Sequence, residues 1–355
     1  MFRVEMLPAK HGDCLLLQYG RRSEPRTVLI DGGPLSSYSE LGDRLRGIAG
    51  SLDLVVATHL DADHLEGLVR LLQDHSAQMQ IGEIWFNGWR HLGSESETLS
   101  PVTAEYLSAL IESCRVPWNS SVNGQAIACS PGTFPVVVLE GGLSLTILSP
   151  STEALRRLKP VWESTLREEG LTPGAATEAA AHLAASRRFG RHDRLGAPDL
   201  DKLAQEAPIS DKSIPNGSSI ALLAEFKGKR VLLSGDCPPG VLERSIQAVS
   251  RLLGERRLRL DAFKIAHHGS KQSVTNSLLE KVDCQNYLIS TDGRYFGHPH
   301  DEAIARIIRH GGRNVNLLFN YQQRGRFWDQ APIRAKESFN TVYPSCNGGL
   351  RLDLL

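Results

Sequence analysis

Several apolar runs of strand length in this sequence end at an aspartate or a histidine. This pattern constrains the possible fold more than any other feature of the chain. Four runs share this property: Thr27–Ile30 before Asp31, Leu52–Thr58 before His59, Arg230–Leu233 before Asp236, and Ala262–Ala266 before His267. Short apolar runs bounded by turn residues are typical of strands. The pattern therefore predicts a fold built on sheets, in which the polar strand ends meet in one shared cleft.

Helical patterns alternate with these runs. The segment after His64 carries leucine or valine at positions 65, 68, 69 and 72, the spacing of one helix face. Further helices are predicted around Tyr38–Ala49 and from near Asp301. The remaining predicted strands are Arg3–Met6, Cys14–Tyr19, Glu83–Phe86, Val136–Leu139, Leu143–Leu148, Ser219–Phe226, Tyr287–Ser290 and Val315–Tyr321. Strands mixed with helices in this way indicate an α/β or α+β fold.

The segment 151–214 differs from the rest in composition. It is rich in Ala, Arg, Glu and Leu, which indicates two or three helices, and its breaks are expected at Pro160, Pro173, Gly190 and Pro198. A segment of about 60 residues folds alone only marginally. We therefore expect a single domain over 1–355 with a helical insertion at 151–214. The insertion is expected to flank the cleft and to offer a surface to a protein partner, the alternative being a helical bundle on a distant face.

A faint internal repeat supports two similar halves. Arg26–Asp31 resembles Lys229–Asp236, and Leu52–His59 resembles Leu260–His267. The aspartate and the histidine are 28 residues apart in the first copy and 31 in the second. The repeat predicts that each half contributes one aspartate and one histidine to the cleft.

Composition excludes several classes of protein. Lys plus Arg and Asp plus Glu each number 40, and this zero net charge argues against a nucleic-acid coat or a polybasic membrane binder. A nucleic-acid enzyme, which needs only local charge, remains compatible. No apolar run reaches the roughly 18 residues of a spanning helix, so no membrane partner is expected. The six cysteines form no CxxC pair and predict reduced thiols in a cytoplasmic protein.

The densest polar cluster lies between a predicted strand and a predicted helix. His59, Asp61, Asp63 and His64 offer four potential ligands within six residues. Imidazole nitrogens and carboxylate oxygens bind Zn²⁺, Mn²⁺ or Fe²⁺, so the cluster predicts a metal site. The structural alternative is a polar loop in which Asp63 caps the helix and His59 packs in the core.

Four other polar elements are ambiguous when taken singly. They are Asp31–Gly33, Ser234–Asp236, His267–Ser270 and Gly297–His300. A strand-end aspartate is often structural, a histidine pair can be buried for packing, and the last element alone suggests a surface loop. With the first cluster they appear in the order IDGG, HxDxDH, SGD, HHGS and GHP, and this joint order is much more specific than any one part.

The five motifs resemble those of the metallo-β-lactamase-fold hydrolases. Within these, the chain is most similar to the branch found in ComEC-type DNA-uptake competence proteins and their stand-alone relatives. The segments that carry the resemblance are HGDCLLLQYG, TVLIDGG, THLDADHLEGL, NGSSIALLAEFKGKRVLLSGD, FKIAHHGSKQS and STDGRYFGHPH. The resemblance covers about 1–150 and 215–325, and the predicted helical insertion lies outside it.

The resemblance implies a four-layered αβ/βα sandwich with two mixed sheets and metal ions at one edge. The implied ligands are His59 and Asp61 at the first metal position, Asp63 and His64 at the second, Asp236 as the bridge, and His267, with His268 as its rival, as the late ligand of the second metal. Asp31 would orient a ligand from behind. His298 would donate a hydrogen bond or a proton to the substrate, and Asp63, Asp236 and His298 would together carry catalysis.

Two positions depart from the family pattern. Asp61 stands where most members have histidine, and Asn216 occupies the place expected for the third histidine of the first metal. Both changes replace nitrogen by oxygen, which makes the first site weaker for zinc and better suited to Mn²⁺ or Mg²⁺. We therefore expect one or two divalent ions, Zn²⁺ or Mn²⁺, with Mg²⁺ as a further candidate.

The resemblance and the motifs predict a metal-dependent phosphodiesterase that acts on nucleic acid or a nucleotide through a water activated by the cation. Candidate phosphate contacts are Arg187, Arg188, Arg191 and Arg194, and candidate base-stacking residues are Trp85, Phe86, Trp89 and Tyr295. A solvated helix face and core packing are the structural alternatives. The functional alternatives are a catalytically impaired binding or regulatory protein with a depleted first metal site, and hydrolysis of a thioester, lactone or lactam.

Overall fold

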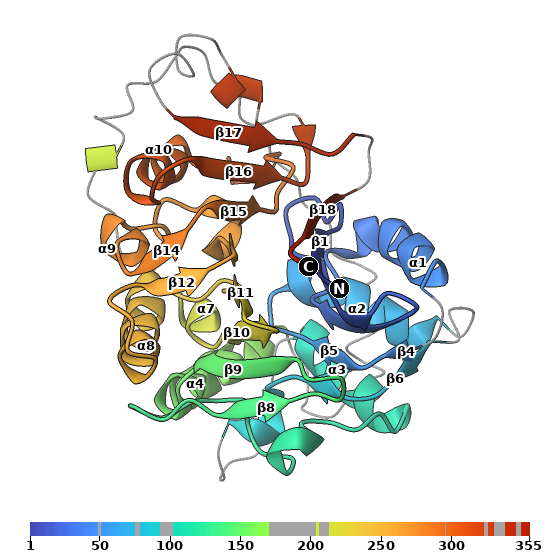
Figure 1. The fold of residues 1–355 in the computed structure, drawn as a ribbon. Helices are drawn as coiled ribbons and strands as arrows, with labels where there is room; N and C mark the ends of the chain where they lie inside the picture. The colour runs from blue at the N-terminus through green and yellow to red at the C-terminus, as the bar shows by residue number, and fades with distance from the viewer. Residues whose placement is uncertain are drawn as a thin grey trace.

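The computed structural model describes residues 1–48, 51–74, 79–92, 102–169, 204–205, 213–294, 296–322, 326–329, 338–345 and 349–355. Two large mixed sheets dominate the molecule (Figure 1). The first and last strands lie together, because β1 (Phe2–Met6) pairs antiparallel with β18 (Leu350–Asp353).

The first sheet contains six strands in the order β18-β1-β2-β3-β5-β7. The strands β2 (Leu15–Arg21) and β3 (Glu24–Ile30) extend β1 as an antiparallel meander. The strands β5 (Leu54–Val56) and β7 (Ile84–Trp85) continue the sheet in parallel. The helices of this half are α1 (Tyr38–Arg46), α2 (Ala62–Gln73) and α3 (Val102–Ser113).

The second sheet contains eight strands in the order β17-β16-β15-β13-β11-β10-β9-β8. The strands are β17 (Phe339–Val342), β16 (Val315–Phe319), β15 (Asn286–Ile289), β13 (Ala262–Lys264), β11 (Lys229–Leu233), β10 (Ala221–Phe226), β9 (Ser144–Ser149) and β8 (Val136–Val138). Pairing is parallel from β17 to β11 and antiparallel from β11 to β8. The helices of this half are α8 (Pro239–Leu252), α9 (Asn276–Leu279) and α10 (Asp301–His310).

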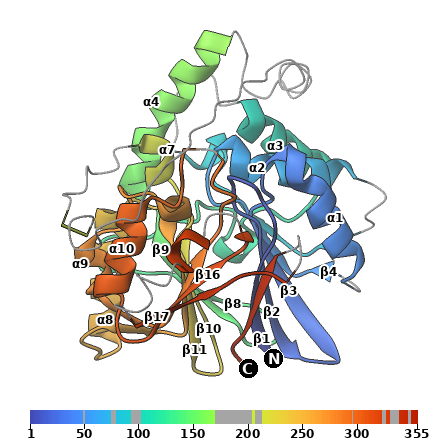
Figure 2. The same ribbon diagram turned by 90° about the horizontal axis from the view of Figure 1, so that it is seen from above.

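Three apolar cores separate four layers. The central core joins the facing sides of the two sheets, with Val4 and Val28 from the first and Leu145 and Leu222 from the second. The outer core of the first sheet packs its strands against α1, α2 and α3, and the outer core of the second packs against α8, α9 and α10. Figure 2 shows the two helical groups on opposite outsides. The expected four-layered αβ/βα sandwich with two mixed sheets is therefore confirmed.

The single strand expected over Leu52–Thr58 is two strands, β4 (Ser51–Leu52) and β5, which belong to different sheets. β4 pairs with β6 (Gln80–Ile81), whereas β5 pairs with β3 and β7. The break falls at Asp53, whose carboxylate accepts hydrogen bonds from the guanidinium of Arg26 and from the backbone N–H of Thr27. These polar contacts turn the chain between two apolar runs.

The expected break at Pro160 is wrong, because helix α4 (Thr152–Glu169) continues through it. A proline in a helix interior removes one backbone hydrogen bond and crowds the preceding turn, which usually kinks or ends the helix. Here Leu155, Leu158 and Trp162 lie on both sides of Pro160 and are buried in the outer core of the first sheet. Packing of both halves of α4 on that core holds the helix together.

The rest of the proposed insertion falls largely outside the described residues, including Pro173, Gly190 and Pro198. Its return to the sheet is described, and α7 (Ile214–Gly217) precedes β10. The minor strands β12 (Leu258–Leu260) and β14 (Val282–Cys284), which pair with each other, have no counterpart among the predicted strands. None of the described helices combines the length and the apolar character that crossing a membrane requires.

Candidate metal centre

The polar strand ends meet at one edge of the sandwich. His59 follows β5 of the first sheet, while Asp236 and His268 follow β11 and β13 of the second. Carboxyl ends of parallel strands gather at the same edge of a sheet, where α/β proteins commonly bind ligands. The fold thus brings together residues that are more than 200 positions apart in the chain.

One group of potential ligands joins the two halves. His59, His64 and Asp236 each present an atom within 4.8 Å of the others, and all three side chains are buried. Asp236 Oδ2 lies 4.0 Å from His59 Nε2 and 3.7 Å from His64 Nε2. Two ligands about 2 Å from one ion at a tetrahedral angle are roughly 3.4 Å apart, so these spacings suit shared metal ligands better than direct hydrogen bonds.

A second group shares His64 with the first. It contains Asp63 and His268, again with ligand atoms within 4.8 Å of one another. His268 Nε2 lies 3.6 Å from Asp63 Oδ2 and 3.8 Å from Asp236 Oδ2. Asp236 therefore faces both groups, the place that a bridging carboxylate requires.

Four buried atoms of this cluster make no hydrogen bond within the described part of the chain. They are Nε2 of His59, His64 and His268, and Oδ1 of Asp236. Burying such a polar atom without a partner costs about 1–3 kcal/mol. Three imidazole nitrogens and a carboxylate oxygen form a donor set typical of zinc and manganese. The residues present therefore fit a divalent cation.

Asp31 lies directly behind His64. Its Oδ2 is 2.7 Å from His64 Nδ1, and its two oxygens also accept the N–H and the hydroxyl of Thr58, each at 2.8 Å. Donation from Nδ1 leaves the lone pair of His64 Nε2 directed at the cluster. The contact places Asp31 beside the ring of His64, and its role in orienting a metal ligand stays a prediction.

A close approach of two glycines holds Asp31 in this place. A Cβ atom on Gly67 of α2 would lie 1.9 Å from the carbonyl oxygen of Gly32. Only glycine at both positions lets the loop after β3 pack against α2, the helix that carries His64. The close contact of Gly32 with Gly67 therefore sets the distance between Asp31 and its histidine.

Asp13 and Lys264 lie behind His268, and sequence reasoning did not single out either residue. Lys264 Nζ donates to Asp13 Oδ2, and both side chains are buried. Asp13 Oδ1 lies 3.4 Å from His268 Nδ1, which itself is 3.0 Å from the carbonyl oxygen of Ser290. The available signal was a lysine at the end of an otherwise apolar strand, three residues before His267.

The backbone of the histidine pair is strained. His267 and His268 have φ angles of 49° and 53°, in the left-handed region that non-glycine residues rarely adopt. Such positions cost about 1–3 kcal/mol each and persist where the surroundings fix them. The N–H of His267 donates to Gly235 O at 3.1 Å, which ties the pair to the loop that carries Asp236. This geometry turns the two adjacent rings in different directions.

The carboxylates and the histidines of the cluster shift each other's pKa values. Burial lowers the pKa of His64, but Asp31, Asp236 and Asp63 outweigh burial and hold that pKa well above its usual value. Burial likewise opposes the charged form of His268, yet Asp236 and Asp13 raise its pKa to about 9. Burial raises the pKa values of Asp63 and Asp236, but the neighbouring histidines pull both well below the usual range. The low pKa values of Asp63 and Asp236 keep these carboxylates charged, and a bound cation would take the place of the protons on the histidines.

Asp61, which is expected beside His59 at the first metal position, is more exposed than the other proposed ligands. Asp61 Oδ2 is 3.5 Å from His59 Nε2, but the Asp61 side chain is 40% exposed. Asn216 Nδ2 is 3.2 Å from His267 Nδ1, and His267 Nε2 is 3.9 Å from Asp236 Oδ2. His267 therefore adjoins Asn216 on one side of Asp236, whereas His268 adjoins Asp63 on the other.

His298 also lies beside the cluster. Its ring is stacked on His268 at a centroid distance of 6.2 Å and meets the edge of His267 at 5.2 Å. Burial first, and then His268, His267 and His300, lower the pKa of His298 to about 2. A neutral imidazole can donate one hydrogen bond, so this position suits the hydrogen-bond role better than the proton-donor role.

A hollow of about 420 Å³ opens onto the cluster, and its lining includes Asp61, Asp63, Asp236, His267 and His268. Phe296, which is 71% exposed, stands at its wall and was not among the predicted aromatic contacts. The stacking hypothesis is wrong for Trp85 and Phe86, because both are buried in the apolar cores. Trp89 packs on Trp162, with ring centroids 6.4 Å apart. The candidates Arg187, Arg188, Arg191, Arg194 and Tyr295 lie outside the described residues.

Two curated proteins are similar to part of the chain. It is 29% identical over 144 residues to ComE operon protein 3 of Bacillus subtilis, which covers 38% of this chain and 17% of that protein. It is 30% identical over 132 residues to Recombination protein 2 of Haemophilus influenzae, covering 36% and 16%. The chain thus spans less than a fifth of each relative. These matches confirm the resemblance to the ComEC-type branch.

Solved structures give weaker likenesses. The metallo-β-lactamase fold protein YhfI of Bacillus subtilis aligns over 99% of both chains at 11% identity with a TM-score of 0.41. A variant of the CmlA β-hydroxylase covers 99% of this chain and 54% of its own, at 11% identity and a TM-score of 0.38. No family model matches the chain. Because these TM-scores are low, the assignment of the architecture depends on the strand order and the layers seen in this molecule.

Proposed function

We propose that this chain is a metal-dependent hydrolase whose substrate is a phosphodiester in nucleic acid or in a nucleotide. The observation that carries the proposal is the convergence of four buried and unpartnered ligand atoms at the sheet edge. The resemblance to the competence-protein branch supports the choice of a nucleic-acid substrate.

The donor set assigns ligands to two adjacent positions. Asp63, His64, His268 and Asp236 would hold one cation, and His59 with Asp236 and Asp61 would hold another. His268 replaces His267 in our assignment, because its buried Nε2 faces both Asp63 and Asp236. The position of His59 and Asp61, the first metal position of the family pattern, has fewer buried ligands, so it should bind more weakly and accept Mn²⁺ or Mg²⁺.

A divalent cation held there would supply Lewis-acid charge and lower the pKa of a water in the hollow. The side chains of the protein position the metal ligands and contact the substrate. Asp31 fixes the ring of His64, and the pair of Asp13 and Lys264 backs His268. His298 can donate a hydrogen bond to a phosphate oxygen from the flank of the cluster.

The test combines metal analysis with a screen of phosphodiesters. Purified protein is analysed for Zn, Mn, Mg and Ni, and each metal is then supplied with bis(p-nitrophenyl) phosphate, a cyclic dinucleotide and single-stranded DNA. We expect about one tightly held metal per chain and turnover of at least one phosphodiester. Asp236→Ala should lose both, and Arg313→Ala, a substitution of an exposed residue, should lose neither. Bound metal without turnover of any phosphodiester would contradict the hydrolytic proposal.

The weaker metal position, that of His59 and Asp61, favours one alternative function. Asp61 is partly exposed, and Asn216 stands where the family usually has a histidine. A protein with one filled position that binds a phosphodiester without cleaving it would fit these two features. Tight binding of an oligonucleotide with no cleavage under any of the four metals would favour this binding or regulatory role.

A further inference from the structure

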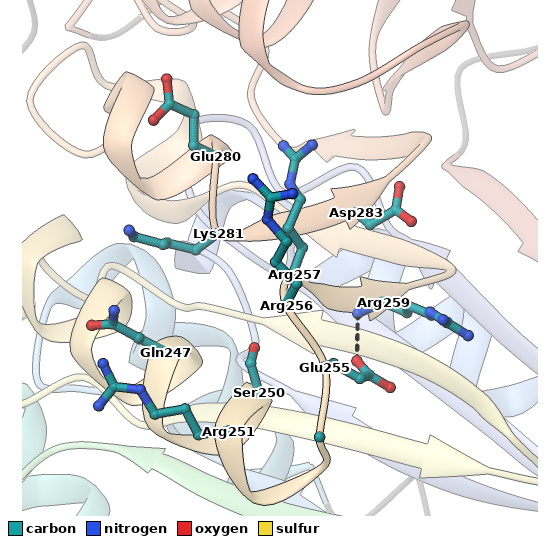
Figure 3. A pocket seen from close by; sticks show the side chains of 11 residues that line it. Gln247, Ser250, Arg251, Glu255, Arg256, Arg257, Arg259, Glu280, Lys281 and Asp283 are labelled. Carbon is teal, nitrogen blue, oxygen red and sulfur yellow. Dashed lines mark hydrogen bonds between the residues drawn. The ribbon is translucent and has the colours of Figure 1, made fainter.

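A second hollow of about 880 Å³ lies away from the metal cluster, at the end of α8 and beside β12 and β14 (Figure 3). Five basic side chains and three acidic ones line it. The basic residues are Arg251, Arg256, Arg257, Arg259 and Lys281. We call this hollow the basic groove. The groove lies at the amino ends of β12 and β14, whereas the metal cluster follows the carboxyl ends of β11 and β13.

The positive charge of the basic groove is largely uncompensated. Within the described part of the chain, no hydrogen bond or ion pair is made by the side chains of Arg251, Arg256, Arg259 or Lys281. Among the acidic residues, Glu255 is paired with Arg230 at 2.7 Å and also accepts the backbone N–H of Arg259 at 3.0 Å, and Glu280 lies 3.7 Å from His310. The lining thus keeps an excess of basic over acidic side chains.

Two buried donors in the basic groove also lack partners. The hydroxyl of Ser250, a residue that is 4% exposed, and Nε of Arg257 make no hydrogen bond within the described residues. Figure 3 shows Ser250 near the end of α8, beside the segment that carries the arginines. A buried donor without an acceptor costs about 1–3 kcal/mol, so each of these two groups would gain from an acceptor oxygen that came within reach.

The partial negative charge at the carbonyl end of α8 does not explain why these basic residues gather here. Arg251 lies in the last turn of α8, where a cation offsets the partial negative charge of the carbonyl end. Arg256, Arg257 and Arg259 lie beyond the helix, and Lys281 comes from the loop before β14. On β12 the alternation buries Leu258 and Leu260 and leaves Arg259 exposed, so the strand itself directs the arginine to the outside.

We propose that the basic groove binds the phosphate groups of a nucleic-acid strand, a proposal that rests on the proposed function by making the same polymer its ligand. The lining has no apolar centre, which a protein interface usually has. Interfaces with nucleic acid are polar and strongly positive instead. None of the described residues that line the groove is aromatic, so binding should depend on the nucleic-acid backbone and not on sequence.

The test measures binding of a fluorescein-labelled single-stranded phosphorothioate oligonucleotide to the metal-loaded protein, by anisotropy over a range of salt. For single strands, each phosphate contact contributes about 0.7 to the slope of log K against log salt. Arg256→Gln with Arg259→Gln should weaken binding about tenfold or more and reduce the slope by about 1.4. Arg313→Gln, elsewhere on the surface, is the matched control and should change neither. Arg259→Lys should retain the slope, since lysine keeps the charge.

Two further measurements keep the outcomes distinct. Unchanged affinity and slope in the double variant would overturn the proposal. So would arginine-dependent binding of a polyglutamate peptide without binding of the oligonucleotide, which would assign the groove to an acidic protein. Hydrolysis of bis(p-nitrophenyl) phosphate should be equal in all variants, because this small ester does not reach from the metal cluster to the groove. Arginine-dependent oligonucleotide binding with no hydrolysis in the unmodified protein would support the groove and contradict the proposed function.

Discussion

Two buried carboxylates, Asp31 and Asp13, stand behind two of the cluster histidines and act on them differently. Asp31 contacts His64 Nδ1 at 2.7 Å and also accepts two hydrogen bonds from Thr58. Asp13 lies 3.4 Å from His268 Nδ1 and pairs with Lys264. The charge of Asp31 is therefore shared with its histidine, whereas that of Asp13 is balanced mainly by an ammonium. We infer that Asp31 fixes a ligand by hydrogen bonding and that Asp13 does so through charge and packing.

The largest effect is expected from breaking the pair behind His268. Lys264→Met removes the cation and leaves the Asp13 carboxylate buried without its main partner. Losing one member of a buried ion pair costs about 3–5 kcal/mol. Chemical denaturation monitored by tryptophan fluorescence should show this drop in the free energy of unfolding. A loss below about 1 kcal/mol would show that Asp13 is solvated or protonated instead.

Removing the charge of Asp31 should affect metal affinity more than stability. Asp31→Asn replaces one acceptor oxygen by an NH2 group, which can only donate, so the side chain cannot accept all three hydrogen bonds. The His64 ring would lose its fixed tautomer. Loss of a residue that hydrogen-bonds to a metal ligand typically lowers metal affinity about 10- to 100-fold. Competition with a chromophoric chelator measures the change, and an affinity equal to that of the unmodified protein would contradict the orienting role.

The double variant Asp13→Asn with Lys264→Met sharpens the comparison. It removes both charges together, and replacing a buried ion pair by neutral groups of similar size is often close to neutral. The free energy of unfolding should recover to within about 1–2 kcal/mol of the unmodified protein. Metal affinity should fall less than it does in Asp31→Asn, because Ser290 O still accepts from His268. A larger fall in affinity than in Asp31→Asn would reverse our ranking of the two carboxylates.

The smallest effect on bound metal is expected at Asp61. Its side chain is partly exposed and adjoins only the weaker metal position, so Asp61→Ala should retain the tight metal while losing hydrolysis. Asp63→Ala, which removes a ligand facing His268, is the comparison variant and should lose the metal. Metal analysis after gel filtration distinguishes them. Equal metal loss in both variants would mean that the two positions do not differ in strength.

The predicted and observed sites differ in ways that follow from local geometry. The repeat of strand, aspartate and histidine correctly places Asp31, His59, Asp236 and the histidine pair at one edge. It does not distinguish His267 from His268, because only the two consecutive left-handed backbone conformations decide which ring faces Asp63. The pattern also misses Asp13, whose partner Lys264 lies 251 residues away in the chain.

By itself, the sequence determined most of the strands, the resemblance and the types of ligand in the cluster, since apolar periodicity and ligand types are local properties. It did not determine that α4 continues through Pro160, because burial of Leu155 and Trp162 outweighs the local preference of proline. It also did not reveal the basic groove, whose cations come from a loop, a strand and a helix end. Only the tertiary structure decided these features, because packing and the convergence of distant charges depend on contacts that no local pattern encodes.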